Sequence, residues 1–131
     1  MRPHRVLIVE DDAPTADSIN DALELAGYET RTACNGREAL DVLADWKPDA
    51  IMADILMPEM DGYDLLKEVR SRPDLQWVAF IFVTAKTCQQ DIRLGKALGA
   101  DDFLVKPFEW DDLFVTVKSR IESLRTLKRV L

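Results

Sequence analysis

The sequence predicts an α/β fold, in which a doubly wound sheet of five parallel strands carries helices on both faces. Short apolar runs alternate with amphipathic stretches five times along the 131 residues, which is the pattern of successive strand and crossover-helix units. No low-complexity segment and no repeat of solenoid length interrupts this alternation. The length fits one domain, and a hydrophobic content of 47% can fill one core on both sides of a sheet.

The first two strands are predicted at 6–9, an apolar run, and at 28–33, which alternates like a strand near the sheet edge. Pro14 suits the first position of the helix after one strand, and Asn35-Gly36 is a start signal for the helix after the other. The buried faces of both helices follow the 3.6-residue period and end at a helix-stopping residue. They are Ile19, Ala22, Leu23 and Ala26 before Gly27, and Ala39, Leu40 and Leu43 before Pro48.

The third strand, at 50–53, ends at Asp54, and Asp61-Gly62 turns the chain into the next helix. The buried stripe of that helix and the proline that ends it are Leu65, Leu66, Val69 and Pro73. Residues 78–83 form the most continuous apolar run, which suits a strand buried on both faces and ends at Thr84.

The fourth helix is predicted around 92–98, where Gly99 caps it. A short strand at 103–105 then ends at Lys106-Pro107. The last helix starts near Glu109 with acidic residues in its first turn, where they complement the helix dipole.

Charge and composition exclude several classes of function. The formal net charge of −7 argues against a nucleic-acid surface, because such binding relies on Lys and Arg that neutralise phosphates. The apolar run near the N-terminus is too short for a signal peptide or a membrane helix, so we expect a cytoplasmic protein that binds no membrane. Cys34 and Cys88 have neither disulfide-framework nor metal-site spacing and are expected to be reduced. His4 is the only histidine, which leaves no histidine-based catalytic pair.

Polar residues follow four of the predicted strands at the point where each strand ends. They are Glu10 and Asp11, Asp54, Thr84 and Lys106. Ligands of doubly wound sheets bind at this end of the strands. A strand order of 2-1-3-4-5 would make the first and third strands neighbours and bring three carboxylates to the mouth of one crevice.

Three carboxylates in a small volume raise one another's pKa unless a cation lies between them. Magnesium prefers octahedral oxygen ligation with few protein carboxylates and several waters, so Mg²⁺ is the predicted cofactor. The Asp54 carboxylate could then act as a nucleophile toward a phosphoryl donor. The Lys106 ammonium and the Thr84 hydroxyl would meet the negative charge of the transferred group.

Four segments resemble the response regulator receiver family, whose fold is the flavodoxin-like (βα)5 sheet. They are Val9-Glu10-Asp11-Asp12, the block Asp54-Ile55-Leu56-Met57-Pro58-Glu59-Met60-Asp61-Gly62, Thr84-Ala85 and Lys106-Pro107-Phe108. The resemblance spans about residues 5 to 125. It implies a phosphorelay switch without substrate turnover, which receives a phosphoryl group from a sensor histidine kinase or a histidine phosphotransfer protein and controls an output or partner. Some members of this family also accept phosphate from small acyl phosphates.

For the metal site, the resemblance implies that Asp54 is the phosphoacceptor and that Asp11 and Asp54 bind Mg²⁺ directly. Glu10 would act through water, and the backbone carbonyl of Leu56 would be the third protein ligand. Leu56 and Lys86 occupy the positions that tune phosphoryl lifetime in the family. Because the Leu56 side chain cannot hydrogen-bond an attacking water, we expect slow self-dephosphorylation.

For the switch, the resemblance implies that Thr84 and Lys106 contact the phosphoryl group and that the Lys106–Pro107 peptide is cis. Phe103 occupies the position of the family's switching aromatic residue. Phosphorylation would draw Thr84 toward the phosphoryl group, let Phe103 fill the vacated space, and change the surface of the fourth helix, fifth strand and fifth helix.

The receiver domain is expected at 1–125, with 118–131 as an extension of its last helix. An apolar seam with basic residues around it continues along this extension, as in a connector or coiled coil to an output module or a homodimer. A helix end that packs on the domain body fits the same pattern. The seam consists of Leu113, Val117, Ile121, Leu124 and Leu131.

Three other functions fit parts of the pattern. A phosphatase that resembles the haloacid-dehalogenase type also passes through an aspartyl phosphate. This chain lacks the proton donor of that class, because Leu56 stands where the class has a second Asp. A docking or dimerisation module independent of phosphorylation would be expected to lack the acceptor, a metal-binding acid or the lysine, and none is missing. A flavin-binding protein would need a hydroxyl-rich phosphate loop after the first strand.

Overall fold

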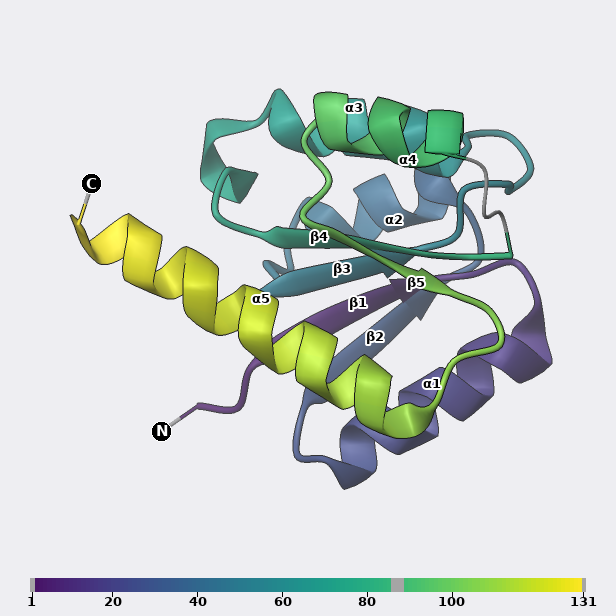
Figure 1. Ribbon diagram of the computed structural model, residues 1–131, viewed down its shortest axis with the longest axis horizontal. Coiled ribbons are helices and arrows are strands. Elements are labelled where there is room, and N and C mark those ends of the chain that lie inside the picture. Colours follow the sequence, from purple (N-terminus) through teal and green to yellow (C-terminus); the bar gives the residue numbers. More distant parts are fainter. Residues whose placement is uncertain (1, 86–88, 131) are drawn as a thin grey trace.

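One parallel sheet forms the centre of the molecule. The computed structural model describes residues 2–85 and 89–130, and Figure 1 shows the sheet between two layers of helices. The strand order is β2-β1-β3-β4-β5, which confirms the predicted doubly wound topology. Val9 at the end of β1 lies opposite Ala33 of β2 and Ala53 of β3, so these three strands end at the same level. The strands are β1 (Arg5–Val9), β2 (Glu29–Ala33), β3 (Ala50–Ala53), β4 (Ala79–Thr84) and β5 (Asp102–Val105).

Helices cover both faces of this sheet. Figure 1 shows α2, α3 and α4 on one face, and α1 and α5 on the other. Their bounds are α1 (Ala13–Leu25), α2 (Gly36–Leu43), α3 (Gly62–Arg70), α4 (Gln89–Ala97) and α5 (Trp110–Val130). All five lie where the sequence predicts them, although α4 begins three residues earlier than expected. Lys86 and Cys88, which entered the sequence analysis, lie outside the described residues.

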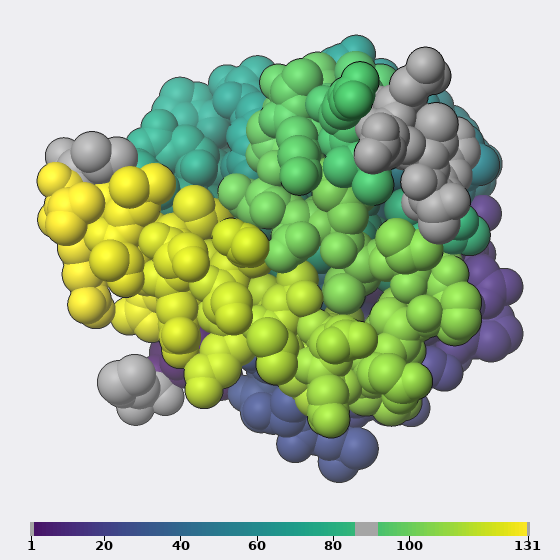
Figure 2. Space-filling view, viewed as in Figure 1, coloured from purple at the N-terminus to yellow at the C-terminus, as the bar shows by residue number. Residues whose placement is uncertain are grey.

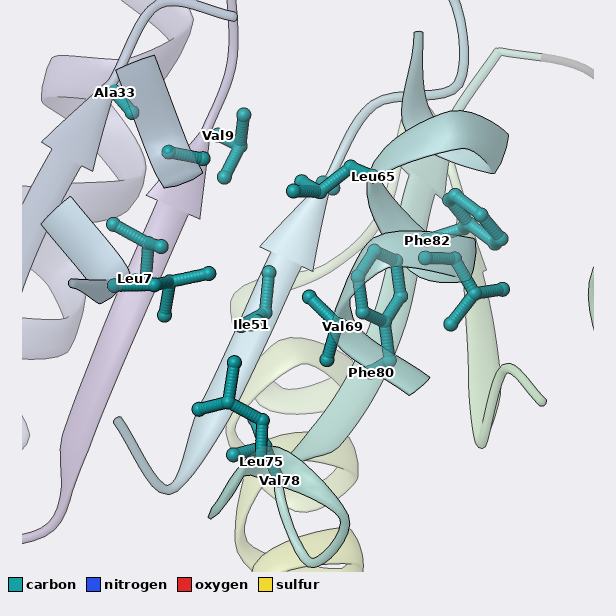
Figure 3. Packing of buried hydrophobic residues seen from close by; sticks show 14 of the residues in the cluster. Leu7, Val9, Ala33, Ile51, Leu65, Val69, Leu75, Val78, Phe80 and Phe82 are labelled. Carbon is teal, nitrogen blue, oxygen red and sulfur yellow. The ribbon is translucent and has the colours of Figure 1, made fainter. Parts of the chain in front are cut away.

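The core consists of two hydrophobic clusters, one on each face of the sheet. Because side chains alternate along a strand, Leu7 and Val9 of β1 belong to the cluster under α2 and α3, whereas Val6 and Ile8 belong to the cluster under α1 and α5. Figure 3 shows the first cluster, in which Phe80 lies near Val69 of α3. Burial on both faces explains why the central strands read as continuous apolar runs.

Side-chain caps start three of the helices. The carboxylate of Asp12 accepts a hydrogen bond from the Thr15 amide at the start of α1. The Asn35 side chain accepts from the Glu38 amide at 2.8 Å, and the Asp61 side chain accepts from the Asp64 amide at 2.9 Å. These caps set where α1, α2 and α3 begin, immediately after the loops that follow β1, β2 and β3.

The segment after α3 differs from the expectation that Pro73 ends this helix. The α-helix ends at Arg70, and Pro73–Leu75 forms a separate turn of 3₁₀ helix. Proline suits the first position of a helical turn, and the turn buries Leu75 completely. A turn of three residues is too short to show a helical periodicity in its apolar residues, so the sequence alone did not reveal this 3₁₀ turn.

The last helix continues beyond the core. Its buried residues are Leu113, Val117 and Ile121, and Leu124 packs partly against the same cluster. Further along, Leu127 is 45% exposed and Val130 is 73% exposed. In the described part of the chain, no helix combines the length and hydrophobicity needed to cross a membrane.

Arg70 fastens α3 to the segments that lead into β4 and β5, and its replacement by alanine is expected to destabilise the protein. Its guanidinium donates to the carbonyls of Gly99 and Val78, each at 2.9 Å, and lies 2.8 Å from the Asp101 carboxylate. Loss of these charge-assisted hydrogen bonds should lower the free energy of unfolding by about 2 kcal/mol. Urea denaturation measures this loss.

Arg72→Ala is the matched control, because among the described residues the Arg72 side chain has one ion pair, with Glu68 at 3.6 Å near the surface. Exposed pairs of this kind contribute on the order of 0.5 kcal/mol. Equal losses in the two variants would contradict the fastening role of Arg70.

Candidate functional site

Backbone hydrogen bonds carry the ends of the strands into one site. The amide of Glu10 donates to Ala33 O at 3.0 Å, and the amide of Asp54 donates to Val9 O at 3.1 Å. At the other side of the sheet, the amide of Lys106 donates to Thr84 O at 2.8 Å. Each of these bonds extends the pairing of neighbouring strands by one residue. The polar residues at the carboxyl ends of β1, β3, β4 and β5 are therefore held at the same end of the sheet.

The three predicted carboxylates form one cluster. One oxygen from each of Glu10, Asp11 and Asp54 can be chosen so that all lie within 4.8 Å of one another. Glu10 is 5% exposed, Asp54 is partly buried, and Asp11 is exposed. The cluster therefore has a protected floor and an open side toward solvent.

Lys106 lies against this cluster. Its ammonium donates to Glu10 Oε1 at 2.6 Å and to Asp54 Oδ2 at 3.1 Å. Burial works against the charged form of Lys106, but the two carboxylates outweigh it and raise the pKa of the ammonium above its ordinary value. Lys106 is therefore a fixed positive charge beside Asp54.

Burial raises the pKa of the Glu10 carboxyl, while its hydrogen bonds from Lys106 and from the Asp12 amide act in the opposite direction. The Asp12 amide donates to Glu10 Oε2 at 3.2 Å. Both oxygens of Glu10 thus have donors, and this carboxyl is positioned rather than free to rotate.

The loop after β3 holds Asp54 in place. The amide of Leu56 donates to Asp54 Oδ1 at 3.3 Å, and the amide of Gly62 donates to Ile55 O at 2.8 Å. Glu59 has a φ of +66°, a left-handed conformation that non-glycine residues adopt rarely and that recurs at functional sites. The Leu56 side chain is 62% exposed at the rim of the site.

Thr84 is buried, as Glu10 is, and Phe103 is partly buried. Thr84 is 2% exposed, at the end of β4. The Phe103 ring lies 5.4 Å from the Phe82 ring, centroid to centroid, and below Gly95 of α4. Phe103 therefore packs partly inside, between the sheet and α4. The Lys106–Pro107 peptide bond is cis.

Two features of the site were not evident from the sequence. The first is the direct contact between Lys106 and Glu10. The sequence indicated that the Lys106 ammonium would meet the transferred phosphoryl group, but it did not indicate a carboxylate partner for Lys106. The second is Gly62, read only as a turn residue, whose Cα lies so close to Asp54 O that a Cβ would be 2.3 Å from it. A glycine at the first position of a helix, after an aspartate cap, is the one local signal for such an approach.

A partly exposed carboxylate, two neighbouring carboxylates and a lysine ammonium can together serve phosphoryl chemistry. The carboxylates and their waters fit a hard divalent cation, because hard cations prefer oxygen ligands. The lysine ammonium suits a group that carries negative charge on its oxygens. Each predicted site residue described above lies in this one region.

Comparison with known proteins agrees with this geometry. Residues 6–118 match the family described as "Response regulator receiver domain". The response regulator MprA of Mycolicibacterium vanbaalenii is 35% identical over 117 residues, which cover 89% of this chain and 50% of that protein. The chain spans about half the length of the curated relatives it matches.

Solved receiver domains have the same fold. The signal receiver domain of a signal transduction histidine kinase from Syntrophus aciditrophicus is 38% identical, with a TM-score of 0.85 over 92% of this chain and 91% of that one. The receiver domain of sensor histidine kinase PA1611 from Pseudomonas aeruginosa has magnesium coordinated in its active site cleft. It is 28% identical, with a TM-score of 0.85 over 92% of this chain and 99% of that chain.

Proposed function

The chain belongs to the response regulator receiver family of two-component signalling, and from this premise we propose that Asp54 accepts a phosphoryl group and that the domain changes conformation in response. The donor is a phosphohistidine on a sensor histidine kinase or a histidine phosphotransfer protein. The domain is thus a switch and has no conventional enzymatic turnover.

One observation carries the proposal. Asp54 is the only member of the carboxylate cluster that combines partial exposure with a direct contact to Lys106, at 3.1 Å, among the residues that the structure describes. Glu10 is too buried to meet a large donor, and Asp11 has no such contact with the ammonium. Asp54 is therefore the carboxylate best placed to act as a nucleophile.

The residues present fit magnesium. Glu10, Asp11 and Asp54 supply hard oxygen donors within 4.8 Å of one another, and the structurally similar domain of PA1611 holds magnesium in its cleft. Asp11 and Asp54 would bind the ion directly, Glu10 through water, and the Leu56 carbonyl would complete the protein ligands. When bound, the ion would offset the charge of the carboxylates and of the phosphoryl oxygens.

In the transfer step, an Asp54 carboxylate oxygen attacks the phosphorus of the donor. The new O–P bond forms as the N–P bond breaks, and the electron pair of that bond returns to the imidazole nitrogen of the donor. The Lys106 ammonium stays beside Asp54 and stabilises charge on the phosphoryl oxygens, and the Thr84 hydroxyl donates to one of them. The positions of Asp54 and Lys106 make little rearrangement necessary.

The response to phosphorylation would begin at Thr84 and Phe103. Movement of Thr84 toward the phosphoryl group would vacate space at the end of β4, and the adjacent Phe103 ring would fill it. Since Phe103 packs below α4, this change would reach α4, β5 and α5. An output module or a second copy of the domain would read this surface. The proposed extension of the last helix at 118–131, which overlaps the end of the receiver domain at 1–125, would connect to such a module.

Beryllium fluoride, which mimics a phosphoryl group on an aspartate, tests this proposal by two-dimensional NMR. Addition of beryllium fluoride with magnesium is expected to give new amide signals at Thr84, at Lys106 and along α4, β5 and α5. The Asp54→Asn variant, which lacks the nucleophilic oxygen pair, should show none of them. Identical spectra of the wild-type protein with and without the mimic would refute the switch.

The phosphorylated state is expected to persist for minutes or longer in the presence of magnesium, because the exposed Leu56 side chain cannot orient an attacking water. Leu56→Asn, which adds a side-chain amide at this rim position, should shorten the half-life by about tenfold. Loss of the adduct from intact protein, followed by mass spectrometry, measures both rates. A wild-type half-life of seconds or less would show that Leu56 does not limit hydrolysis.

A further inference from the structure

A basic hollow lies at the amino ends of the β-strands, opposite the carboxyl ends where Asp54 lies. Its volume is about 410 Å³, and it is lined by Arg2, His4, Asp49, Arg125, Lys128 and Arg129. Figure 1 shows how it arises: the N-terminal segment and the last turns of α5, far apart in the sequence, lie at the same end of the molecule. In Figure 2 these last turns are open to solvent.

Positive charge in this hollow is not balanced by the protein. Its lining carries four side chains that are cationic at neutral pH and one carboxylate, Asp49. That carboxylate already accepts a hydrogen bond from the Arg5 amide at 2.8 Å and lies 3.5 Å from His4 Nδ1. Within residues 2–85 and 89–130, Arg2, Lys128 and Arg129 form no ion pair.

This arrangement is unusual in a chain with a net charge of −7. Like charges held close together repel, whereas the distant carboxylates of the protein are screened beyond roughly 10 Å at ordinary salt. An adjoining hollow shares Arg2, Asp49, Arg125 and Lys128 with the basic hollow, and there Lys47 pairs with Asp74 at 2.8 Å, so this carboxylate already has a cation. The cations of the basic hollow are therefore free to bind an anion from outside the chain.

We propose that the basic hollow is a binding site for a compact, multiply charged phosphate anion, of the class of nucleoside polyphosphates and inorganic oligophosphates. Guanidinium groups match phosphate oxygens in pairs, and Arg125 is already oriented by a 3.2 Å contact with His4 Nε2. A concave site of this volume suits a small ligand better than it suits the flat surface of a partner protein. The site is separate from Asp54 and does not depend on its phosphorylation.

Isothermal titration calorimetry with inorganic tripolyphosphate, at low ionic strength and with EDTA to remove divalent ions, tests the proposal. Wild-type protein should bind one tripolyphosphate. Lys128→Ala/Arg129→Ala should weaken binding by at least about tenfold, because two charge-assisted contacts are lost. The matched control Lys67→Ala/Lys96→Ala removes the same charge from exposed positions on α3 and α4 and should leave binding unchanged.

NMR with the same ligand locates the site: the amides of Arg2, His4 and residues 125–129 should shift, and those of Asp54, Thr84 and Lys106 should not. A titration with adenosine triphosphate in place of tripolyphosphate shows whether a nucleoside adds affinity. Adenosine triphosphate that binds as tightly as tripolyphosphate, or more tightly, supports the site. Equal weakening in the two double variants would overturn the proposal, because binding would then follow net charge alone. Absence of binding, or tighter binding of a poly-glutamate peptide than of tripolyphosphate, would also overturn it.

Discussion

Replacement of Lys106 by methionine is expected to slow phosphorylation of Asp54 by a small acyl phosphate about 100-fold, the typical cost of one positioned donor at a developing negative charge. Methionine keeps the length of the side chain and removes its charge. The ammonium it replaces lies 3.1 Å from Asp54 Oδ2, where the phosphoryl oxygens would gather. The rate of adduct formation, followed by mass spectrometry, measures the effect.

The same substitution should tighten magnesium binding, because it removes a cation from beside Glu10 and Asp54. A slower transfer together with stronger metal binding separates the role of Lys106 from simple loss of the metal. Lys96→Met on the exposed face of α4 is the control and should change neither quantity. A Lys106→Met rate within a few-fold of wild type would mean that the ammonium does not act on the transferred group.

Gly62→Ala is expected to lower the free energy of unfolding by about 3 kcal/mol, near the upper end for overpacking. A Cβ on Gly62 would lie 2.3 Å from the Asp54 carbonyl oxygen and 2.8 Å from Cε1 of Phe82. The first is backbone and the second is a fully buried ring, so neither can move aside cheaply. Because the shift must displace Asp54, phosphorylation should slow as well. Urea denaturation and the adduct assay measure the two effects.

Gly27→Ala is the matched control for this prediction. Gly27 has a φ of +99°, but a Cβ there would have no atom within 4 Å. Its replacement should cost about 1 kcal/mol through backbone strain alone and leave phosphorylation unchanged. Equal stability losses at the two positions would show that the close approach of Gly62 to Asp54 has no energetic weight.

The strands and their central or edge character could be predicted from local signals, and the order 2-1-3-4-5 came with the doubly wound fold class. The runs at 6–9 and 50–53 are apolar throughout, as expected of central strands, whereas 28–33 alternates, as expected of an edge. Once these positions are assigned, the residues that follow the strands are necessarily brought to one edge. Asp54 and Lys106, 52 positions apart, could therefore be placed together from the sequence alone.

What the sequence did not reveal depends on contacts between distant segments. The hydrogen bonds of Arg70 reach residues up to 31 positions away, and no local pattern distinguishes Arg70 from an exposed basic residue. The Lys106–Glu10 contact spans 96 positions. The basic hollow combines Arg2 with Lys128, which lie near opposite ends of the chain. Such features depend on how the elements pack, and periodicity reports only on one element at a time.

Intact mass spectrometry after incubation with a small acyl phosphate and magnesium tests the central claim most directly. We expect a single phosphoryl adduct on the wild-type protein, none on Asp54→Asn, and none when EDTA removes the metal. An adduct that persists in Asp54→Asn would contradict the assignment of the acceptor. Absence of any adduct on wild-type protein, both with the acyl phosphate and with a phosphorylated histidine phosphotransfer protein, would contradict the switch and leave a domain that acts by docking alone.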